Sequence, residues 1–197
     1  MQIEQQLAIA KCAQPFSFLG PTFLPEGASI NAWLPGATKV DVTSVDGKDV
    51  LGSLTQQGVS ALFSGEVSGL AQGQLYSLTI TTQDAQFQRV DPYQFQDAAY
   101  HAVHFIDHAP ENLYRQAGAQ LISIGDDIAA TRFTVYAPNA SAVSVIGYFN
   151  LGNETAHPMQ KTELGFWVLV VPGRDSYNPL TLPTKHRVTQ ELDARST

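Results

Sequence analysis

Thr131-Arg-Phe-Thr-Val-Tyr-Ala-Pro-Asn-Ala-Ser-Ala-Val-Ser-Val-Ile-Gly-Tyr-Phe-Asn150 alternates apolar and polar residues, breaks at Pro138-Asn139, and then resumes the alternation. A period of two residues is typical of a strand with one buried face, and Pro-Asn is typical of a turn. The stretch therefore predicts a strand, a tight corner and a second strand.

The same pattern occurs earlier in the chain. Ile30-Asn-Ala-Trp-Leu-Pro-Gly-Ala-Thr-Lys-Val-Asp-Val42 aligns with residues 133–145 without a gap, and residues 61–67 correspond to 165–171. An internal repeat of this kind indicates two copies of one module. The second copy is expected to lack its closing strands, because nothing after Gly173 repeats the residues that end the first copy.

The composition favours a folded, cytoplasmic protein. Of the 197 residues, 44% are hydrophobic and 15% are charged, which is enough apolar material for real cores. A net charge of -7 with only 11 Lys and Arg argues against a nucleic-acid partner. The single cysteine, Cys12, excludes an internal disulfide, and no apolar run is long enough to cross a membrane or to form a secretion signal.

Glycine and proline punctuate short β-rich segments at the spacing expected of a β-sandwich. The sequence therefore predicts an all-β protein with two tandem β-sandwiches, the second incomplete. The predicted parts are a short N-terminal helix and connector (1–27), a first module (28–95), a helical bridge (96–120), a truncated second module (121–173) and a disordered tail (174–197).

The polar side chains show no catalytic constellation, and we expect no cofactor. His101, His104 and His108 with Asp107 could present metal ligands on one face of a helix, but histidines in a polar bridge are more often solvated or capping residues. No hydrolase elbow, phosphate-binding loop or zinc-protease motif occurs.

Aromatic side chains are the candidates for ligand binding, because a flat ring can lie against the apolar face of a sugar. Strand alternation places most of Trp33, Tyr136 and Phe149 inside, whereas Tyr148 and Asn150 flank a turn. The predicted carbohydrate-binding residues are Trp33, Tyr148, Asn150 and Trp167.

Four stretches, in order, resemble the N-terminal region of bacterial 1,4-α-glucan (glycogen) branching enzymes. They are Pro15-Phe-Ser-Phe-Leu-Gly-Pro21, Ala32-Trp-Leu-Pro-Gly-Ala37, Asp91-Pro-Tyr-Gln-Phe95, and residues 131–173 with His157-Pro-Met159 and Val171-Pro-Gly173. The last stretch resembles a family-48 carbohydrate-binding module.

This resemblance implies that the two sandwiches are immunoglobulin-like and normally precede a (β/α)8 barrel with an aspartate nucleophile and a glutamate acid/base. Such a barrel needs about 250 residues and does not fit in this chain. The chain is therefore expected to be a truncated branching-enzyme fragment that does not branch glucan alone, with α-glucan (glycogen or amylose) as its partner. The alternative is a non-catalytic glucan-binding or protein-interaction module.

One motif departs from the family. Its turn usually reads glycine, aspartate, phenylalanine, asparagine and, two residues on, tryptophan, whereas residues 147–152 place Tyr148 at the acid and Gly152 at the tryptophan. Without that ring, the resemblance implies residual or no glucan binding by the second copy.

Overall fold

The computed structural model describes residues 3–101, 117–125 and 128–173. The chain forms two compact units: Phe16–Gln94, called here the first module, and Met1–Pro15 with Phe95–Thr197, called the second module. The N-terminal residues therefore belong with the second half of the chain. The predicted tail and most of the predicted bridge lie outside the described residues.

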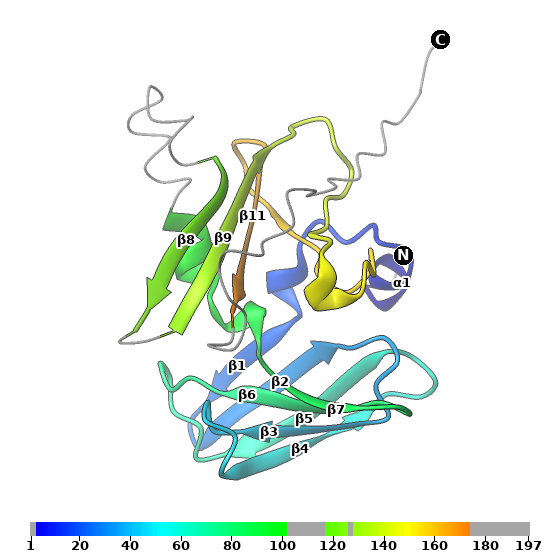
Figure 1. The fold of residues 1–197 in the computed structure, drawn as a ribbon, viewed down its shortest axis with the longest axis vertical. Helices are drawn as coiled ribbons and strands as arrows, with labels where there is room; N and C mark the ends of the chain where they lie inside the picture. Colours follow the sequence, from blue (N-terminus) through cyan, green and yellow to red (C-terminus); the bar gives the residue numbers. More distant parts are fainter. Residues whose placement is uncertain (1–2, 102–116, 126–127, 174–197) are drawn as a thin grey trace. The chain divides into compact units, whose positions relative to one another are not determined.

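The first module consists of seven antiparallel strands in the order β1-β2-β5-β4-β3-β6-β7 (Figure 1). β4 pairs with β3 up to Leu54 and with β5 through Thr55 and Gln56, so it passes from one layer to the other. The elements are η1 (Pro15–Ser17, at the start of the module), β1 (Gly20–Leu24), β2 (Gly27–Trp33), β3 (Lys39–Thr43), β4 (Val50–Gln56), β5 (Leu62–Ser68), β6 (Ser77–Thr81), β7 (Gln86–Val90) and η2 (Pro92–Gln94).

One continuous hydrophobic cluster fills the first module. It draws alternate residues from β2 and β5 on one side and from β3 and β6 on the other, among them Ile30, Phe63, Val40 and Leu78, each at most 1% exposed. This is the burial that a period of two residues predicts. The prediction of an all-β sandwich is confirmed, while the immunoglobulin-like topology stays a prediction.

The second module contains a four-stranded antiparallel sheet in the order β10-β11-β9-β8. Residues 96–101 are helical. The other elements are α1 (Ile3–Ala8), β8 (Gly118–Ile124), β9 (Ile128–Tyr136), η4 (Tyr148–Asn150), β10 (Gln160–Lys161) and β11 (Phe166–Pro172).

The strand register confirms the internal repeat. In the first module Trp33 of β2 lies opposite Leu62 of β5, and in the second module Tyr136 of β9 lies opposite Phe166 of β11. These are the pairs that the sequence alignment equates. The same correspondence extends to an outer strand in each module: β1 pairs with β2, and β8 pairs with β9.

The predicted second strand after the Pro138 corner is wrong. It is reduced to a single bridge between Ser144 and Pro158. Val145 N–H donates to His157 O and Met159 N–H donates to Val143 O, at 3.0 and 2.8 Å. The ladder does not lengthen beyond these bonds, because the Val145 carbonyl accepts a hydrogen bond from the Asn150 side chain instead. Val143 and Val145 are nevertheless buried, so the alternation predicted the burial but not the pairing.

The N-terminal helix ends in a Schellman motif. Lys11 N–H donates to Gln6 O at 2.7 Å and Ala10 N–H donates to Leu7 O at 3.2 Å, while Ala10 adopts a left-handed backbone with φ of 54°. Glycine is the usual residue at this position, because a Cβ makes the left-handed conformation costly.

The substitution Ala10→Gly is therefore expected to stabilise the second module by about 0.5–1 kcal/mol, after allowance for the extra freedom of glycine in the unfolded chain. The matched change Ala8→Gly, within the helix, should destabilise it by a similar amount. Urea unfolding of the full chain measures both. A lower stability for Ala10→Gly would contradict this account of the helix end.

Candidate functional site

The turn that contains η4 is organised by one buried side chain, Asn150. Its Oδ1 accepts a hydrogen bond from Gly147 N–H at 2.9 Å, and its Nδ2 donates to Val145 O at 2.8 Å and to Asn153 O at 3.3 Å. Asn150 is 8% exposed. The side chain therefore supplies the backbone bonds that a regular strand would have made.

Asn150 also contacts His157, which has no exposed surface. Asn150 Nδ2 and His157 Nδ1 are 3.1 Å apart. Asn150 Nδ2 has two hydrogens for three possible acceptors, Val145 O, Asn153 O and His157 Nδ1, so at least one hydrogen is shared between two of them. The ring of Phe149 meets His157 edge-on at 5.1 Å and remains 40% exposed. The turn thus presents Phe149 from a rigid support.

Trp167, on β11, supports the corner that joins β9 to the turn. Its ring is fully buried and its Nε1 donates to Ala137 O at 2.9 Å. Lys161 Nζ lies 5.3 Å from the centre of this ring and donates to Pro138 O and Ala140 O at 2.9 and 3.0 Å. Ring, ammonium group and carbonyl oxygens together hold the Pro138 corner.

The four residues predicted to bind carbohydrate are placed differently. Trp33 lies at the end of β2 in the first module and is 5% exposed, and Trp167 and Asn150 are buried in the second module. The backbone of Tyr148 lies in η4, beside Asn150, and its side chain is outside the described residues. The structure therefore brings Tyr148 and Asn150 into one turn.

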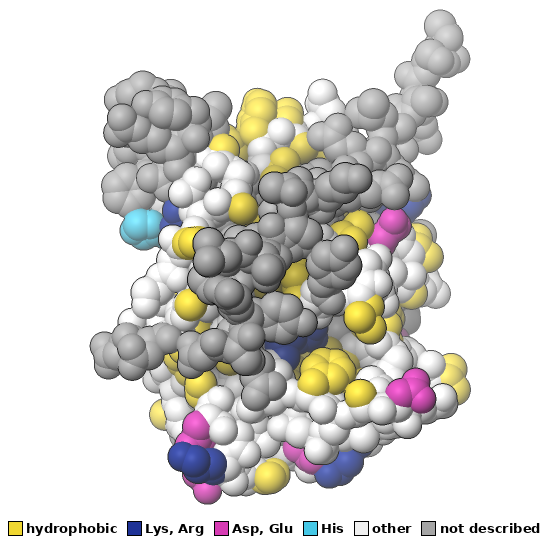
Figure 2. Space-filling model, viewed as in Figure 1, with side chains coloured by type: hydrophobic (Ala, Val, Ile, Leu, Met, Phe, Trp, Pro, Cys, Tyr) yellow, Lys and Arg dark blue, Asp and Glu magenta, His cyan; other side chains and the backbone are white. Residues whose placement is uncertain are grey.

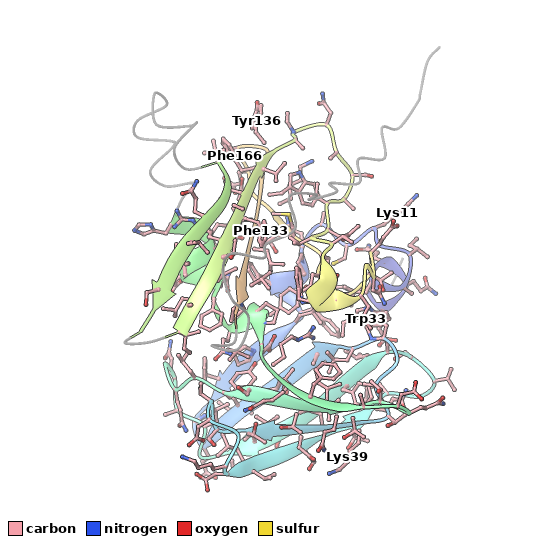
Figure 3. All side chains as sticks on the ribbon, in the orientation of Figure 1. Lys11, Trp33, Lys39, Phe133, Tyr136 and Phe166 are labelled. Carbon is pink, nitrogen blue, oxygen red and sulfur yellow. The ribbon has the colours of Figure 1, made fainter. Side chains whose placement is uncertain are left out.

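Two exposed aromatic side chains were expected inside. Tyr136 is 57% exposed and Phe149 is 40% exposed, so the expectation from strand alternation is wrong for both. Tyr136 is the last residue of β9, where its ring leans on Phe166 with centroids 4.9 Å apart (Figure 3). Phe149 belongs to a turn, where a period of two residues does not apply.

Comparison with known families divides the chain at the same place as the repeat. Residues 2–93 match the family described as alpha-1,4-glucan branching enzyme GlgB, N-terminal domain. Residues 118–194 match carbohydrate-binding module 48, the isoamylase N-terminal domain. The chain belongs to the N-terminal region of the GlgB family. The GlgB enzyme of Pseudoalteromonas atlantica is 48% identical over 177 residues, which are 88% of this chain and 24% of that enzyme.

Other GlgB enzymes are similar to this chain over the same N-terminal part of their length. Those of Photobacterium profundum and Vibrio parahaemolyticus are each 36% identical over 85% of this chain, and 23% and 22% of their own lengths are covered. The chain thus spans about a quarter of the length of these GlgB relatives. Among solved structures, apo pullulanase from Klebsiella pneumoniae shares 23% identity over 44% of this chain and 10% of its own, with a TM-score of 0.33.

The position where the family's turn usually carries tryptophan is open in this chain. Gly152 has a φ of 73°, and a Cβ placed there would find no atom within 4 Å. Its neighbour Leu151 is 94% exposed with a φ of 53°. Space alone would admit a side chain at position 152, but the left-handed backbone there suits the glycine that this chain has.

The other features considered, metal ligands, membrane spans and charged patches, give no evidence of a site in the described residues. Of the four residues considered as metal ligands, only His101 is described, and the described residues contain no group of three His, Cys, Asp or Glu that could hold a metal. No described helix is long and apolar enough to span a membrane. On the face shown in Figure 2, the described charged side chains form small separate spots among hydrophobic and uncharged ones.

The substitution Asn150→Ala is expected to destabilise the second module by about 2–3 kcal/mol, because it leaves Gly147 N–H and Val145 O without their partner in a largely buried turn. Leu151→Ala is the matched control, since that side chain is almost fully exposed. Urea unfolding, with hydrogen exchange of peptides covering residues 143–159, measures both. Equal stability of the two variants would show that Asn150 does not organise the turn.

Proposed function

We propose that this chain is the non-catalytic N-terminal region of a glucan branching enzyme and that its second module contacts α-glucan through the η4 turn. The order of the two family matches, with carbohydrate-binding module 48 over residues 118–194, supports this proposal. Catalysis is expected to depend on the three quarters of the GlgB relatives that this chain does not span.

The observation that carries the glucan proposal is the exposed ring of Phe149 on a turn held by Asn150 and His157. A flat ring in a fixed orientation can stack on the apolar face of a glucose unit without a large loss of side-chain entropy. In this proposal Phe149 and Tyr148 touch the sugar. The buried Asn150 and Trp167 act indirectly, by holding the turn and the corner before it.

Affinity is expected to be low, because Gly152 stands where the family usually has a second stacking ring. Neighbouring rings contribute jointly when a chain of sugar units lies across them. The direct role of Trp33 that the sequence predicted also remains a proposal, and its 5% exposure implies a small contact area.

Co-sedimentation of the full chain with glycogen tests the proposal. Phe149→Ala and Tyr148→Ala are each expected to lower the bound fraction, with an increase in dissociation constant of about fivefold for the loss of one stacked ring. The matched control is Phe87→Ala in the first module, whose ring is similarly exposed at 43%. Retention that falls equally in all three variants, or that is absent in the parent chain, would contradict a glucan site at this turn.

Incubation with amylose tests the catalytic half of the proposal. The pure chain is expected to form no new α-1,6 linkages under conditions in which a full-length GlgB enzyme does. Branching activity in the pure chain would overturn the assignment as a non-catalytic region. If the chain neither branches nor binds glucan, the protein-interaction alternative takes its place.

A further inference from the structure

The first fifteen residues precede the first module in sequence but pack with the second module. We call residues 3–15 the N-terminal strap. Two of its side chains, Leu7 and Cys12, are each 1% exposed, so they are anchors rather than surface residues. The region matched by carbohydrate-binding module 48 begins only at residue 118, so the strap is an addition to that module from a distant part of the chain.

The strap closes one edge of the second module's sheet. Lys161 N–H, in β10, donates to Ala13 O at 2.8 Å. Around this bond, Gln14 Nε2 donates to Lys161 O at 3.4 Å and Gln160 Nε2 donates to Gln14 Oε1. The other side of β10 pairs with β11. The strap therefore covers backbone groups that would otherwise form an open sheet edge.

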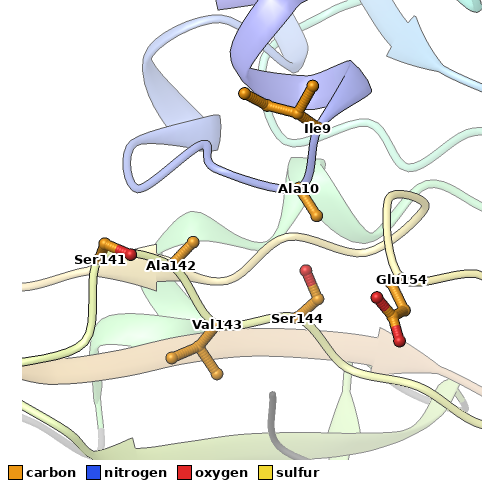
Figure 4. Close-up of a pocket in the computed structure, with 7 residues that line it drawn as sticks. All are labelled: Ile9, Ala10, Ser141, Ala142, Val143, Ser144 and Glu154. Atoms are coloured by element: carbon orange, nitrogen blue, oxygen red, sulfur yellow. The ribbon is translucent and has the colours of Figure 1, made fainter. Parts of the chain in front are cut away.

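Of the thirteen residues of the strap, three are buried: Leu7, Cys12 and Pro15. Beyond its anchors, the strap reaches the module beside an open pocket lined by Ile9, Ala10, Ser141–Ser144 and Glu154 (Figure 4). Ile9 itself is 50% exposed. A six-residue helix such as α1 has little stability by itself, so its structure depends on this docking.

We propose that the N-terminal strap docks on the second module and releases from it as a unit, and that release uncovers the β10 edge and Cys12 while β8, β9 and β11 remain folded. Segments held by few buried side chains open locally at a lower free energy than a core sheet. The proposal does not depend on glucan binding. Burial raises the pKa of the Cys12 thiol, so the docked strap also keeps this cysteine unreactive.

Reaction of the full chain with Ellman's reagent tests the proposal, because Cys12 is the only cysteine. Cys12 is expected to react slowly in the native chain. Leu7→Ala, which removes the main anchor, should raise the rate at least about tenfold. Gln5→Ala is the matched control on the exposed face of the same helix and should leave the rate within about twofold. An unchanged rate in Leu7→Ala would overturn the proposal.

Amide hydrogen exchange by NMR distinguishes release of the strap from unfolding of the module. The Lys161 amide reports the strap directly, because it donates to Ala13 O. In Leu7→Ala its exchange should accelerate by a factor similar to that of Cys12, while the paired amides in the middle of β9 and β11 keep their protection. Acceleration of all these amides together would show that the strap opens only when the module unfolds, which also overturns the proposal.

Discussion

The substitution Asp91→Ala is expected to lower the free energy of unfolding of the first module by about 3–5 kcal/mol. Asp91 is 2% exposed, and its carboxylate accepts hydrogen bonds from the Tyr76 hydroxyl and from Tyr93 N–H. Removing it leaves both donors buried without an acceptor, which costs more than the net worth of the bonds themselves.

Charge interactions among the residues around Asp91 add to the loss of stability. Burial raises the pKa of the Asp91 carboxyl, against the hydrogen bonds from Tyr76 and Tyr93 and the attraction of the Arg89 guanidinium. Burial and the adjacent Asp91 charge raise the pKa of Tyr76 well above its usual value. Gln94 joins the same cluster by donating to Tyr76 O and Asp91 O. Without Asp91, Arg89 loses its nearby opposite charge as well.

Urea unfolding of the full chain, resolved by hydrogen exchange of peptides covering β3 to β7, measures this effect. Asp84→Ala is the control, because Asp84 is an exposed carboxylate in the loop between β6 and β7. Tyr76→Phe should cost less than Asp91→Ala, since it removes one hydroxyl and leaves the carboxylate its other contacts. A loss in Asp91→Ala no larger than that of Asp84→Ala would refute the role of this cluster.

The second large effect is expected from Trp167→Ala, which should destabilise the second module by about 3–5 kcal/mol. The ring is fully buried, and its removal would leave a cavity beside the Pro138 corner. It would also remove the face over which Lys161 Nζ lies and leave Ala137 O without its indole donor. Trp167→Phe keeps much of the side-chain volume, so the stability of this variant should lie between those of the parent chain and Trp167→Ala.

The chain offers a convenient measurement, because Trp33 and Trp167 are its only tryptophans and each belongs to one module. In Trp167→Ala, fluorescence reports Trp33 in the first module, whose urea midpoint should hardly move. Hydrogen exchange of β9 and β11 should instead lose its protection. Tyr136→Ala, an aromatic truncation at an exposed position of the same sheet, is the control. Comparable effects of the two changes would mean that Trp167 does not carry the core of this module.

The repeat shows what a pattern can predict. Matching residues 30–42 with 133–145 depends only on the order of apolar and polar residues, and the register of Trp33 with Leu62 and of Tyr136 with Phe166 confirms it. The register of two paired strands depends on which faces must be buried, and the order of apolar and polar residues is visible in the sequence. The edge strand β1 was not predicted, because its apolar residues Phe23 and Leu24 are adjacent and exposed and give no alternation.

The predicted binding residues show what a sequence pattern cannot predict. Trp33 and Trp167 were predicted to bind carbohydrate, yet both are buried. Phe149, which was expected inside, is exposed. A side chain's chemistry is visible in the sequence, but its exposure depends on which other segments lie against it. The role of Asn150 is of the same kind, since its bonds to Gly147, Val145 and His157 exist only when the turn is folded.

The sequence by itself determined the fold class, the two related modules, and the resemblance to branching enzymes, because each is encoded in periodicity and in short ordered motifs. Only the tertiary structure decided that residues 131–150 contain one strand rather than two, because Asn150 takes the Val145 carbonyl that a ladder would need. It alone showed that the N-terminal strap completes the second module, because a contact between Ala13 and Lys161 leaves no periodic signal in the chain.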